Sequence, residues 1–240
     1  KFHGLENLAL IPGTVGGAPI QNIGAYGVEI EQFISEVEVL ELESGKIRRF
    51  TRKECEFAYR DSVFKNQLCN QIVVLSVSFQ LNQGGPPNIS YPSLYAAIEI
   101  ELAKISGSQE VTPQLIFDTV CRIRRAKLPD PAVIGNAGSF FKNPVVSQSK
   151  HAQLRDQFPD LPSFPISDTD LVKIPAAWLL DQSGWRGRSR GAAAVHKDHA
   201  LVLVNLGDAT GEEILLLAQE MSQSTLDRYG IALETEVRII

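Results

Sequence analysis

The spacing of apolar and polar residues changes several times along the 240-residue chain. Residues 4–27 follow no period, because glycine and proline recur among small and polar residues, and this excludes a long helix or a regular strand. From residue 34 the period becomes two. Residues 35–39 alternate, residues 43–46 read Glu-Ser-Gly-Lys as in a hairpin, and an extended strand resumes over 46–50.

Residues 72–81 predict a further strand, half-buried through one apolar face. The residues expected on that face are Val73, Leu75, Val77, Phe79 and Leu81. Residues 83–93 are rich in glycine and proline and predict a loop.

Helical periods follow. Residues 112–127 begin at a capping threonine and a proline, and residues 175–184 run from a proline to a glycine. Thr210 opens a capping box before an amphipathic helix over 214–229, which Gly230 stops. Strands are expected after the second and third of these helices.

The strands of this second half are short. Residues 200–205 form a continuous apolar run, and residues 233–240 alternate, with Glu234, Glu236 and Arg238 on one face. Such a row is usually a cross-strand pair exposed to solvent.

Composition is that of a globular protein, with 44% hydrophobic and 21% charged residues, enough for one large domain or two ordinary ones. The net charge of -5 argues against a dedicated nucleic-acid binder. Cys55, Cys69 and Cys121 are odd in number and form no paired motif, which favours a reducing compartment. No apolar run is long enough to span a membrane.

Two glycine-rich stretches are candidates for chemistry. Residues 4–27 expose backbone amides, which suits a phosphate or a flat heterocycle, although they match no known phosphate-loop pattern and also read as a packed connection. In residues 135–144, flanking glycines hold Ser139 rigidly at the edge of a pocket, or in a turn where it caps an amide.

Other polar residues have alternative readings. Arg60, beside Tyr59 and Asp61, is either a surface ion pair or a cation held on a turn facing the pocket. Lys127 ends a helix, where a cation is favoured without any function. His196 and His199 lack further ligands, and we reject a metal site.

Taken together, several motifs resemble the family of UDP-N-acetylenolpyruvoylglucosamine reductases (UDP-N-acetylmuramate dehydrogenases). They occur in the right order and extend over nearly the whole chain. The matching stretches are Ile11–Gly27, Tyr59–Ser62, Lys127–Pro131, Gly135–Pro144, Ala194–His196 and Glu234–Arg238.

The resemblance implies an α+β fold: the C-terminal part of an FAD-binding (vanillyl-alcohol-oxidase-like) domain plus a smaller α+β substrate-binding domain. The expected boundaries are 1–128, rejoined by a strand over 230–240, and 129–229. Family members carry a further N-terminal subdomain, and this chain opens at Lys1 without a methionine. We therefore expect an incomplete flavin site.

The resemblance also implies the reaction. NADPH reduces FAD, which reduces UDP-N-acetylglucosamine enolpyruvate to UDP-N-acetylmuramate for peptidoglycan synthesis, and hence for cell-wall biogenesis, cell shape and division. The resemblance leads us to expect a cytoplasmic monomer without nucleic-acid or membrane partners.

The same resemblance assigns residues. Arg60 and Glu236 would stabilise an enolate, and Ser139 would donate a proton to it. The residues matching FAD contacts are Pro12, Gly13, Thr14, Gly16, Gly17, Gln21, Ile23, Gly24 and Arg238. Those matching UDP-sugar contacts are Tyr91 (on a loop folded over the substrate), Lys127, Asn143 and Lys173. Phe164 stands where some relatives have a tyrosine near the uridine.

Two alternatives stay open. A carbohydrate oxidase of the same broad fold normally carries a histidine or cysteine motif for covalent flavin, and none is evident. A truncated UDP-sugar-binding fragment without cofactor would fit the incomplete start.

Overall fold

The structure is a computed structural model that describes residues 2–104, 110–166 and 168–239. It divides into two compact units, Lys1–Arg124 and Arg125–Ile240, each described by itself below. Helices and small sheets are mixed in both, which confirms the expected α+β class. These units are defined by the compactness of the chain. The FAD-binding and substrate-binding domains expected from the sequence are functional assignments, and they stay predictions.

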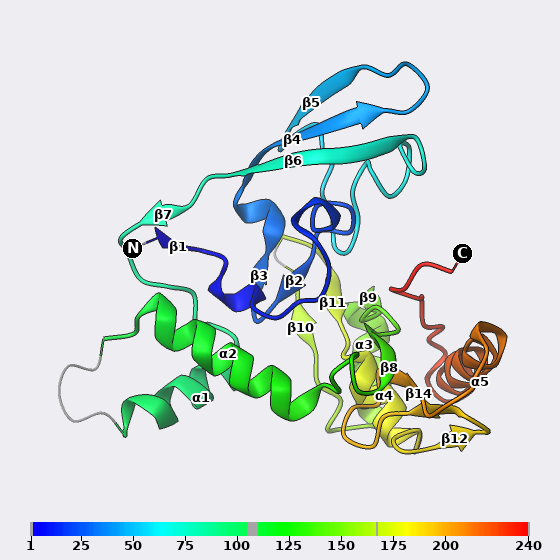
Figure 1. Cartoon of the computed structure of the whole chain (residues 1–240). Coiled ribbons are helices and arrows are strands. Elements are labelled where there is room, and N and C mark those ends of the chain that lie inside the picture. The colour runs from blue at the N-terminus through cyan, green and yellow to red at the C-terminus, as the bar shows by residue number, and fades with distance from the viewer. Residues whose placement is uncertain (1, 105–109, 167, 240) are drawn as a thin grey trace. The chain divides into compact units, whose positions relative to one another are not determined.

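An antiparallel sheet in the order β5-β4-β6 dominates the first unit (Figure 1). It consists of β4 (Ile34–Glu41), β5 (Ile47–Thr51) and β6 (Ile72–Phe79), and all of these strands were predicted. Gly45 has a φ of 66° in the β4–β5 turn, a backbone conformation that glycine adopts without strain.

The face of β6 predicted to be buried is wrong over its first half. Val39 pairs with Val74 and Glu38 with Ser76, so Leu75 is an extra residue in β6, a β-bulge. The extra residue turns the side chains before the bulge to the opposite face of the sheet from the one predicted. Val77 and Phe79 pack on the core as predicted, whereas Val73 and Leu75 are each 47% exposed.

The glycine-rich N-terminal stretch forms short elements, as predicted. β1 (Phe2–His3) pairs with β7 (Asn82–Gln83), and β2 (Gly24–Ala25) pairs with β3 (Val28–Glu29). Two 3-10 turns, η1 (Glu6–Leu8) and η2 (Val15–Gly17), lie between β1 and β2, and a third, η3 (Ile30–Gln32), follows β3.

Two helices follow. α2 (Pro113–Lys127) is the predicted helix, and Thr112 Oγ1 accepts a hydrogen bond from Leu115 N at 3.2 Å. α1 (Pro92–Leu102) was not predicted. The first unit contains α1 and all but the last turn of α2. The helices share a buried cluster, which includes Ile98 and Val120.

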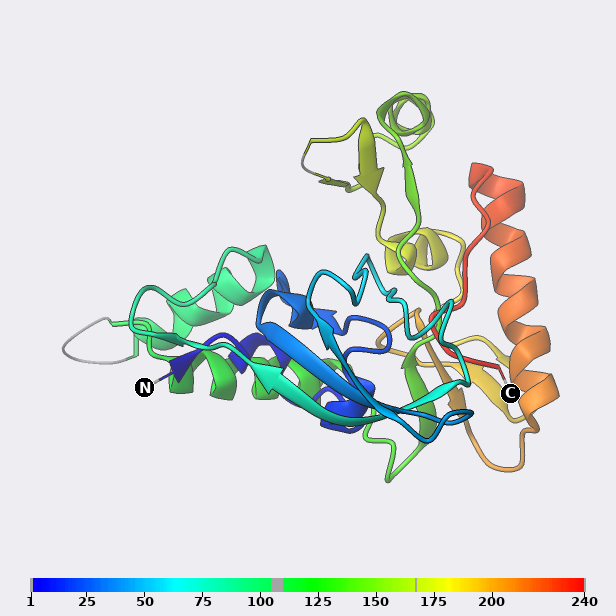
Figure 2. The same ribbon diagram turned by 90° about the horizontal axis from the view of Figure 1, so that it is seen from above.

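In the second unit, β12-β13-β14-β8 form an antiparallel sheet. The strands are β8 (Gly135–Ser139), β12 (Ser189–Arg190), β13 (Ala193–Val195) and β14 (Val202–Asn205). Residues 135–139, read from sequence as a turn, are therefore a strand. α5 (Gly211–Tyr229) lies against this sheet (Figure 2). Its predicted capping box at Thr210 and left-handed Gly230 are confirmed.

A second sheet, β10-β11-β9, projects from the same unit. Its strands are β9 (Val145–Ser147), β10 (Phe164–Pro165) and β11 (Leu171–Lys173). α3 (Gln148–Gln157) connects β9 to this region and was not predicted. α4 (Ala176–Gln182) follows β11 and ends before Gly184, as predicted.

The strand predicted over 233–240 is wrong for the described residues, 233–239. They form one isolated bridge, between Phe141 and Thr235, and no regular strand. Leu233 nevertheless lies in the core, because this segment packs beside residues 140–142. Among the described residues, no helix is long and apolar enough to cross a membrane.

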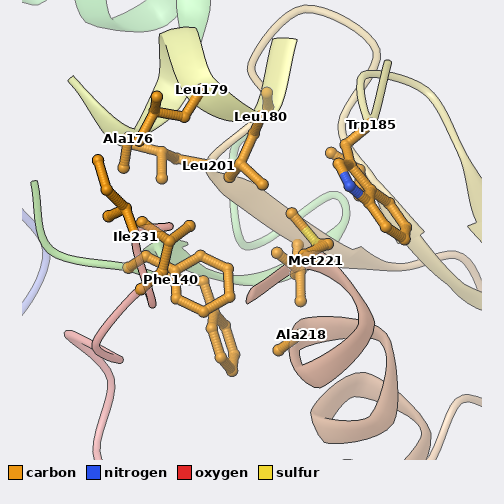
Figure 3. Close-up of a cluster of buried hydrophobic side chains, with 14 of the residues drawn as sticks. Phe140, Ala176, Leu179, Leu180, Trp185, Leu201, Ala218, Met221 and Ile231 are labelled. Carbon is orange, nitrogen blue, oxygen red and sulfur yellow. The ribbon is translucent and has the colours of Figure 1, made fainter. Parts of the chain in front are cut away.

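The core of the second unit gathers side chains from α4, α5 and the four-stranded sheet (Figure 3). Met221 of α5 is 0% exposed and lies in this cluster. Both tryptophans of the chain, Trp178 and Trp185, belong to the same region. Tryptophan fluorescence therefore reports on the second unit.

We expect Met221→Ala to lower the free energy of unfolding of the second unit by about 2–5 kcal/mol, because the deletion leaves a cavity in a buried cluster. Urea unfolding followed by tryptophan fluorescence measures this. Leu226→Ala is the matched control: Leu226 is on the same helix but 42% exposed, and its effect should stay within about 0.5 kcal/mol. Equal effects would contradict the assignment of Met221 to the core.

Candidate functional site

A cavity of about 300 Å³ opens in the first unit, beside the glycine-rich stretch. Its walls include many of the residues predicted to contact FAD, namely Pro12, Gly13, Thr14, Gly17, Gln21 and Ile23. Apolar residues complete it: Leu5, Leu8, Ile11, Val15, Ala18, Ile30 and Phe79. Apolar walls with a few polar groups suit a flat organic ligand.

Local hydrogen bonds shape this wall. Thr14 Oγ1 accepts a hydrogen bond from Gly17 N at 3.2 Å, which caps η2. Gly13 has a φ of 120°, and a Cβ there would meet nothing within 4 Å. Glycine is thus required at Gly13 by the backbone and leaves the space beside it open.

Gly16 and Gly24, also predicted to contact FAD, do not line this cavity. A Cβ on Gly16 would lie 3.5 Å from Val74 O, so Gly16 packs on β6. A Cβ on Gly24 would lie 2.8 Å from Arg60 Nη1. The apolar floor of the cavity was missed, because residues such as Phe79 carry only the ordinary signal of a strand.

Arg60 is held on a turn, as one reading of the sequence predicted. Ala58 and Asp61 form a bridge around it, and Arg60 has a φ of 53°. Its Nη2 donates to Gly24 O at 2.7 Å, and its side chain is 15% exposed. Burial and backbone contacts set Arg60 apart from an ordinary surface ion pair.

Tyr91 is the last residue of the irregular segment 84–91, which agrees with the predicted loop, and it is the N-cap of α1. Its ring stands edge-on to Tyr26, with ring centroids 5.6 Å apart. Burial raises the pKa of Tyr26, so its phenol stays neutral at ordinary pH. Tyr91 is half-buried against the cluster of α1 and α2.

Ser139 is the last residue of β8 and is half-buried. Val202 pairs with Ser139 but Val204 with Asn136, so β8 bulges between them, where Gly138 has a φ of 71°. Asn136 Oδ1 also accepts a hydrogen bond from Gly138 N at 3.0 Å. The position of Ser139 is therefore fixed by a glycine bulge.

The Ser139 hydroxyl has no hydrogen-bond partner among the residues that the structure describes. It therefore does not cap a local amide there, which was the other reading of the sequence.

The C-terminal segment brings Glu236 to the chain immediately after Ser139. Glu236 N donates to Phe140 O at 2.8 Å, and Lys142 N donates to Glu234 O at 2.9 Å. Ser139 and Glu236, distant in sequence, thus lie on neighbouring segments of the second unit. Arg238, predicted to contact FAD, is exposed further along this segment.

Lys173 lies on the small sheet, paired with Val145 on one side and Phe164 on the other. Directly paired residues share a face, so these side chains form a row. Val145 is 40% and Phe164 41% exposed, and the row therefore faces away from the core. It offers an aromatic and an aliphatic surface beside a cation.

Asn143 has a structural contact that the sequence did not suggest. Its Oδ1 accepts a hydrogen bond from Ala176 N at 2.9 Å, at the first residue of α4. A side-chain acceptor at a helix N-terminus satisfies an amide that lacks an intrahelical partner. Asn143 is thus, at least in this contact, part of the frame of the second unit.

Lys127 is exposed at the last residue of α2. Burial lowers the pKa of His199, and the charge of Lys127 acts in the same direction while Asp181 opposes it.

No group of three or more potential metal ligands gathers among the described residues.

Arg60 belongs to the first unit, and Ser139 and Glu236 belong to the second. Each half of the predicted catalytic set is therefore placed within its own unit. Their meeting in one site stays a prediction.

Comparison with known proteins first gives the class. Residues 1–51 match the sequence profile of an FAD-binding domain, which covers most of the cavity wall. The fold of the chain resembles the crystal structure of the UDP-N-acetylenolpyruvylglucosamine reductase from Thermus caldophilus. The TM-score is 0.64 over 99% of this chain and 64% of that chain, with 23% identity. The chain thus has the fold of an FAD-binding protein.

The particular family follows from closer relatives. Residues 130–240 match the C-terminal domain of UDP-N-acetylenolpyruvoylglucosamine reductase. The reductase of Pasteurella multocida is 48% identical over 239 residues, 100% of this chain and 67% of that protein. That of Amoebophilus asiaticus is 45% identical over 100% of this chain and 69% of its own length. The chain belongs to the UDP-N-acetylenolpyruvoylglucosamine reductase family.

The chain is shorter than these relatives. It spans 66% of the length of the reductase of Photobacterium profundum, with which it is 47% identical over 240 residues.

Proposed function

We propose that the chain is the part of an FAD-dependent reductase that holds the reactive groups, and that it reduces UDP-N-acetylglucosamine enolpyruvate to UDP-N-acetylmuramate with NADPH. The observation that carries the proposal is the cavity wall. The stretch that resembles the family motif, residues 11–27, supplies much of the wall of one cavity in the first unit. The process served would be cytoplasmic synthesis of peptidoglycan precursors.

FAD fits the cavity in kind. The wall combines open glycine backbone at Gly13, a hydroxyl at Thr14 and apolar side chains, which is the surface that part of a dinucleotide requires. When bound, FAD takes a hydride from NADPH and supplies it to the substrate. Arg238 is the residue of the second unit that we assign to the same cofactor.

The row on the small sheet supports binding of the UDP-sugar. Phe164 and Val145 offer an apolar surface for a base or sugar, and Lys173 between them offers a counter-charge for a phosphate. We assign Lys127 and Tyr91 to the same substrate. Asn143 would contact it while its carbonyl oxygen caps α4.

Reduction of the enolpyruvyl double bond adds a hydride to its terminal carbon and leaves an enolate on the carboxylate side. Arg60 stabilises this negative charge, and Glu236 stabilises it either as a neutral hydrogen-bond donor or through a bridging proton. The proton of the Ser139 hydroxyl then forms the C–H bond at the adjacent carbon, and water returns a proton to the serine oxygen. A rigid Ser139 serves this transfer, because the hydroxyl must meet the enolate at a fixed angle.

Glu236→Gln tests the neutral-donor role in combination with Glu236→Ala. Glutamine still donates, so the Gln variant should keep more turnover than the Ala variant. Equal losses would contradict simple donation by Glu236.

The first test is binding of FAD to the 240-residue chain. We expect flavin absorbance to co-elute with the protein after gel filtration. Gly17→Val should weaken binding by about tenfold or more, because it fills the cavity at a cost of about 1–3 kcal/mol. A Cβ on Gly17 meets only Thr14 Oγ1, at 3.5 Å, so the fold tolerates the change.

Gly207→Val is the matched control: Gly207 lies in the second unit, and a Cβ there would meet nothing within 4 Å. It should leave FAD binding unchanged. Absence of FAD binding in a folded chain would contradict the proposal for this chain. Retained UDP binding would then favour the cofactor-free UDP-sugar-binding fragment.

A further inference from the structure

The guanidinium of Arg60 is fixed from several sides within the first unit. Beyond the bond to Gly24 O at 2.7 Å, its Nη1 lies 3.4 Å from Asn22 O and 3.9 Å from Glu29 Oε1. Arginine has many rotamers, and an unsupported side chain would sample them. These contacts are therefore needed to hold the Arg60 guanidinium in one position.

Glu29, at the end of β3, is itself oriented. Its Oε2 accepts a hydrogen bond from Asn22 Nδ2 at 3.1 Å, while Oε1 faces Arg60. The carboxylate thus connects the side chain of Asn22 to the guanidinium. Its side chain is 28% exposed, so substitution at Glu29 does not open a cavity in the core.

Asn22 anchors this group. It is 0% exposed and has a φ of 45°, a left-handed conformation that asparagine tolerates. Its Nδ2 also donates to Ala58 O at 3.0 Å, at the start of the turn that carries Arg60, and its Oδ1 accepts from Glu31 N at 3.1 Å. One buried amide thus connects the glycine-rich stretch, β3–η3 and the Arg60 turn.

Gly24 gives the group its space. A Cβ there would come within 2.8 Å of Arg60 Nη1 and 2.9 Å of Glu29 Cγ. The approach of guanidinium and carboxylate at this point therefore requires glycine.

The same stretch also lines the cavity. Gln21 and Ile23, on either side of Asn22, are among the lining residues. Residues that line the cavity and the residue that supports Arg60 are therefore consecutive in the chain. The position of the Arg60 guanidinium is thus coupled to the position of this part of the cavity wall.

We propose that Glu29 is a positioning residue for Arg60, held in place by Asn22. The catalytic consequence rests on the proposed function. Misplacement of a reactive group by about 1 Å costs on the order of 100-fold in rate. Loss of the Glu29 carboxylate frees the guanidinium to leave the place where the enolate charge develops.

The test that needs no turnover is low-temperature NMR of the arginine Nη–H signals, assigned by their loss in Arg60→Lys, because Nη1 and Nη2 make the contacts described above. In the wild-type chain we expect slow exchange of the Arg60 signal with water. In Glu29→Ala exchange should quicken by about tenfold or more, because the charge partner 3.9 Å from Arg60 Nη1 is lost. Glu29→Gln, whose amide oxygen still accepts from Asn22 Nδ2 but carries no charge, should restore part of the protection.

Glu31→Gln is the matched control, because Glu31 is another partly exposed carboxylate, 3.7 Å from Arg52. It should leave the Arg60 signal unchanged. An Arg60 signal equally protected in wild type and Glu29→Ala would overturn the inference.

The second readout is turnover of UDP-N-acetylglucosamine enolpyruvate with NADPH. Glu29→Ala should lower kcat by about 10- to 100-fold while the Kd for UDP, which lacks the carboxylate, stays unchanged. Loss of turnover together with loss of UDP binding would instead indicate general damage to the fold and count against a positioning role.

The two proposals fail separately. Loss of Arg60 protection in Glu29→Ala together with unchanged turnover would keep Glu29 as the support of Arg60 and contradict the role of Arg60 in the reaction. Absence of turnover in the wild-type chain would contradict the proposed function, and the NMR result would still decide the inference.

Discussion

Replacing Ser139 by alanine is expected to reduce kcat by about 10²- to 10⁴-fold, the usual contribution of a positioned proton donor. The physical reason is that the enolate must receive its proton at carbon, and alanine carries none. The bulge at Gly138 that fixes Ser139 is a property of the backbone, so Ser139→Ala should leave the fold intact. Stopped-flow absorbance separates flavin reduction by NADPH, which should be unchanged, from flavin reoxidation by the substrate, which should slow.

Ser189→Ala supplies the control for Ser139, because Ser189 is an exposed serine in the same sheet. It should change neither step. A Ser139→Ala enzyme with turnover within a few-fold of wild type would contradict the proton-donor role, and a slowed first step would place the defect in cofactor binding.

Replacing Arg60 by lysine is expected to lower kcat by about 10²- to 10³-fold, the range measured when one donor to a developing negative charge is lost. Lysine keeps the positive charge but lacks the planar guanidinium with its several N–H donors. Its single ammonium group therefore cannot keep the contacts with Gly24 O and Asn22 O and at the same time face the carboxylate of the substrate. Steady-state kinetics with NADPH and the enolpyruvyl substrate, together with UDP binding, measures the effect.

The control for Arg60→Lys is Arg49→Lys. Arg49 forms an exposed pair with Glu38 at 2.9 Å on β5, where the exchange should be neutral. If Arg60→Lys retained full turnover, the need for a fixed guanidinium would be contradicted. If it lost UDP binding as well, Arg60 would serve the nucleotide and not the enolate.

The elements with strong local signals were predictable from the sequence. α5 has a capping box at one end and a left-handed glycine at the other, and α2 has a threonine cap followed by proline. These features act within one turn of a helix, so they can be read without knowledge of the rest of the chain.

The errors arose where partners distant in sequence decide the structure. The bulge at Leu75 follows from the register with β4, because residues 72–75 of β6 are all apolar and do not mark which face is buried. Likewise, the segment around Thr235 has the period of a strand but finds only one bridge partner, at Phe141, among the described residues. α3 was missed because its polar sequence buries only Leu154.

The candidate site was predictable in part. The glycine-rich stretch and the turn of Arg60 were placed by motif, and the structure puts much of the first around a cavity. The supports of these residues were not predictable. Asn22 was visible only as one polar residue in a stretch of small ones, and its contacts with Glu29 and Ala58 O depend on the folded chain.

The contact between Asn143 and α4 limits how this protein can be redesigned. A library that varies Asn143 would also vary the capping of Ala176 N, and loss of such a cap costs about 0.5–2 kcal/mol of stability. The side chain of Phe164 is exposed on a short strand, so its substitution should cost little stability. If both residues contact the sugar nucleotide as proposed, substitutions at Phe164 should change specificity at less cost in stability than substitutions at Asn143.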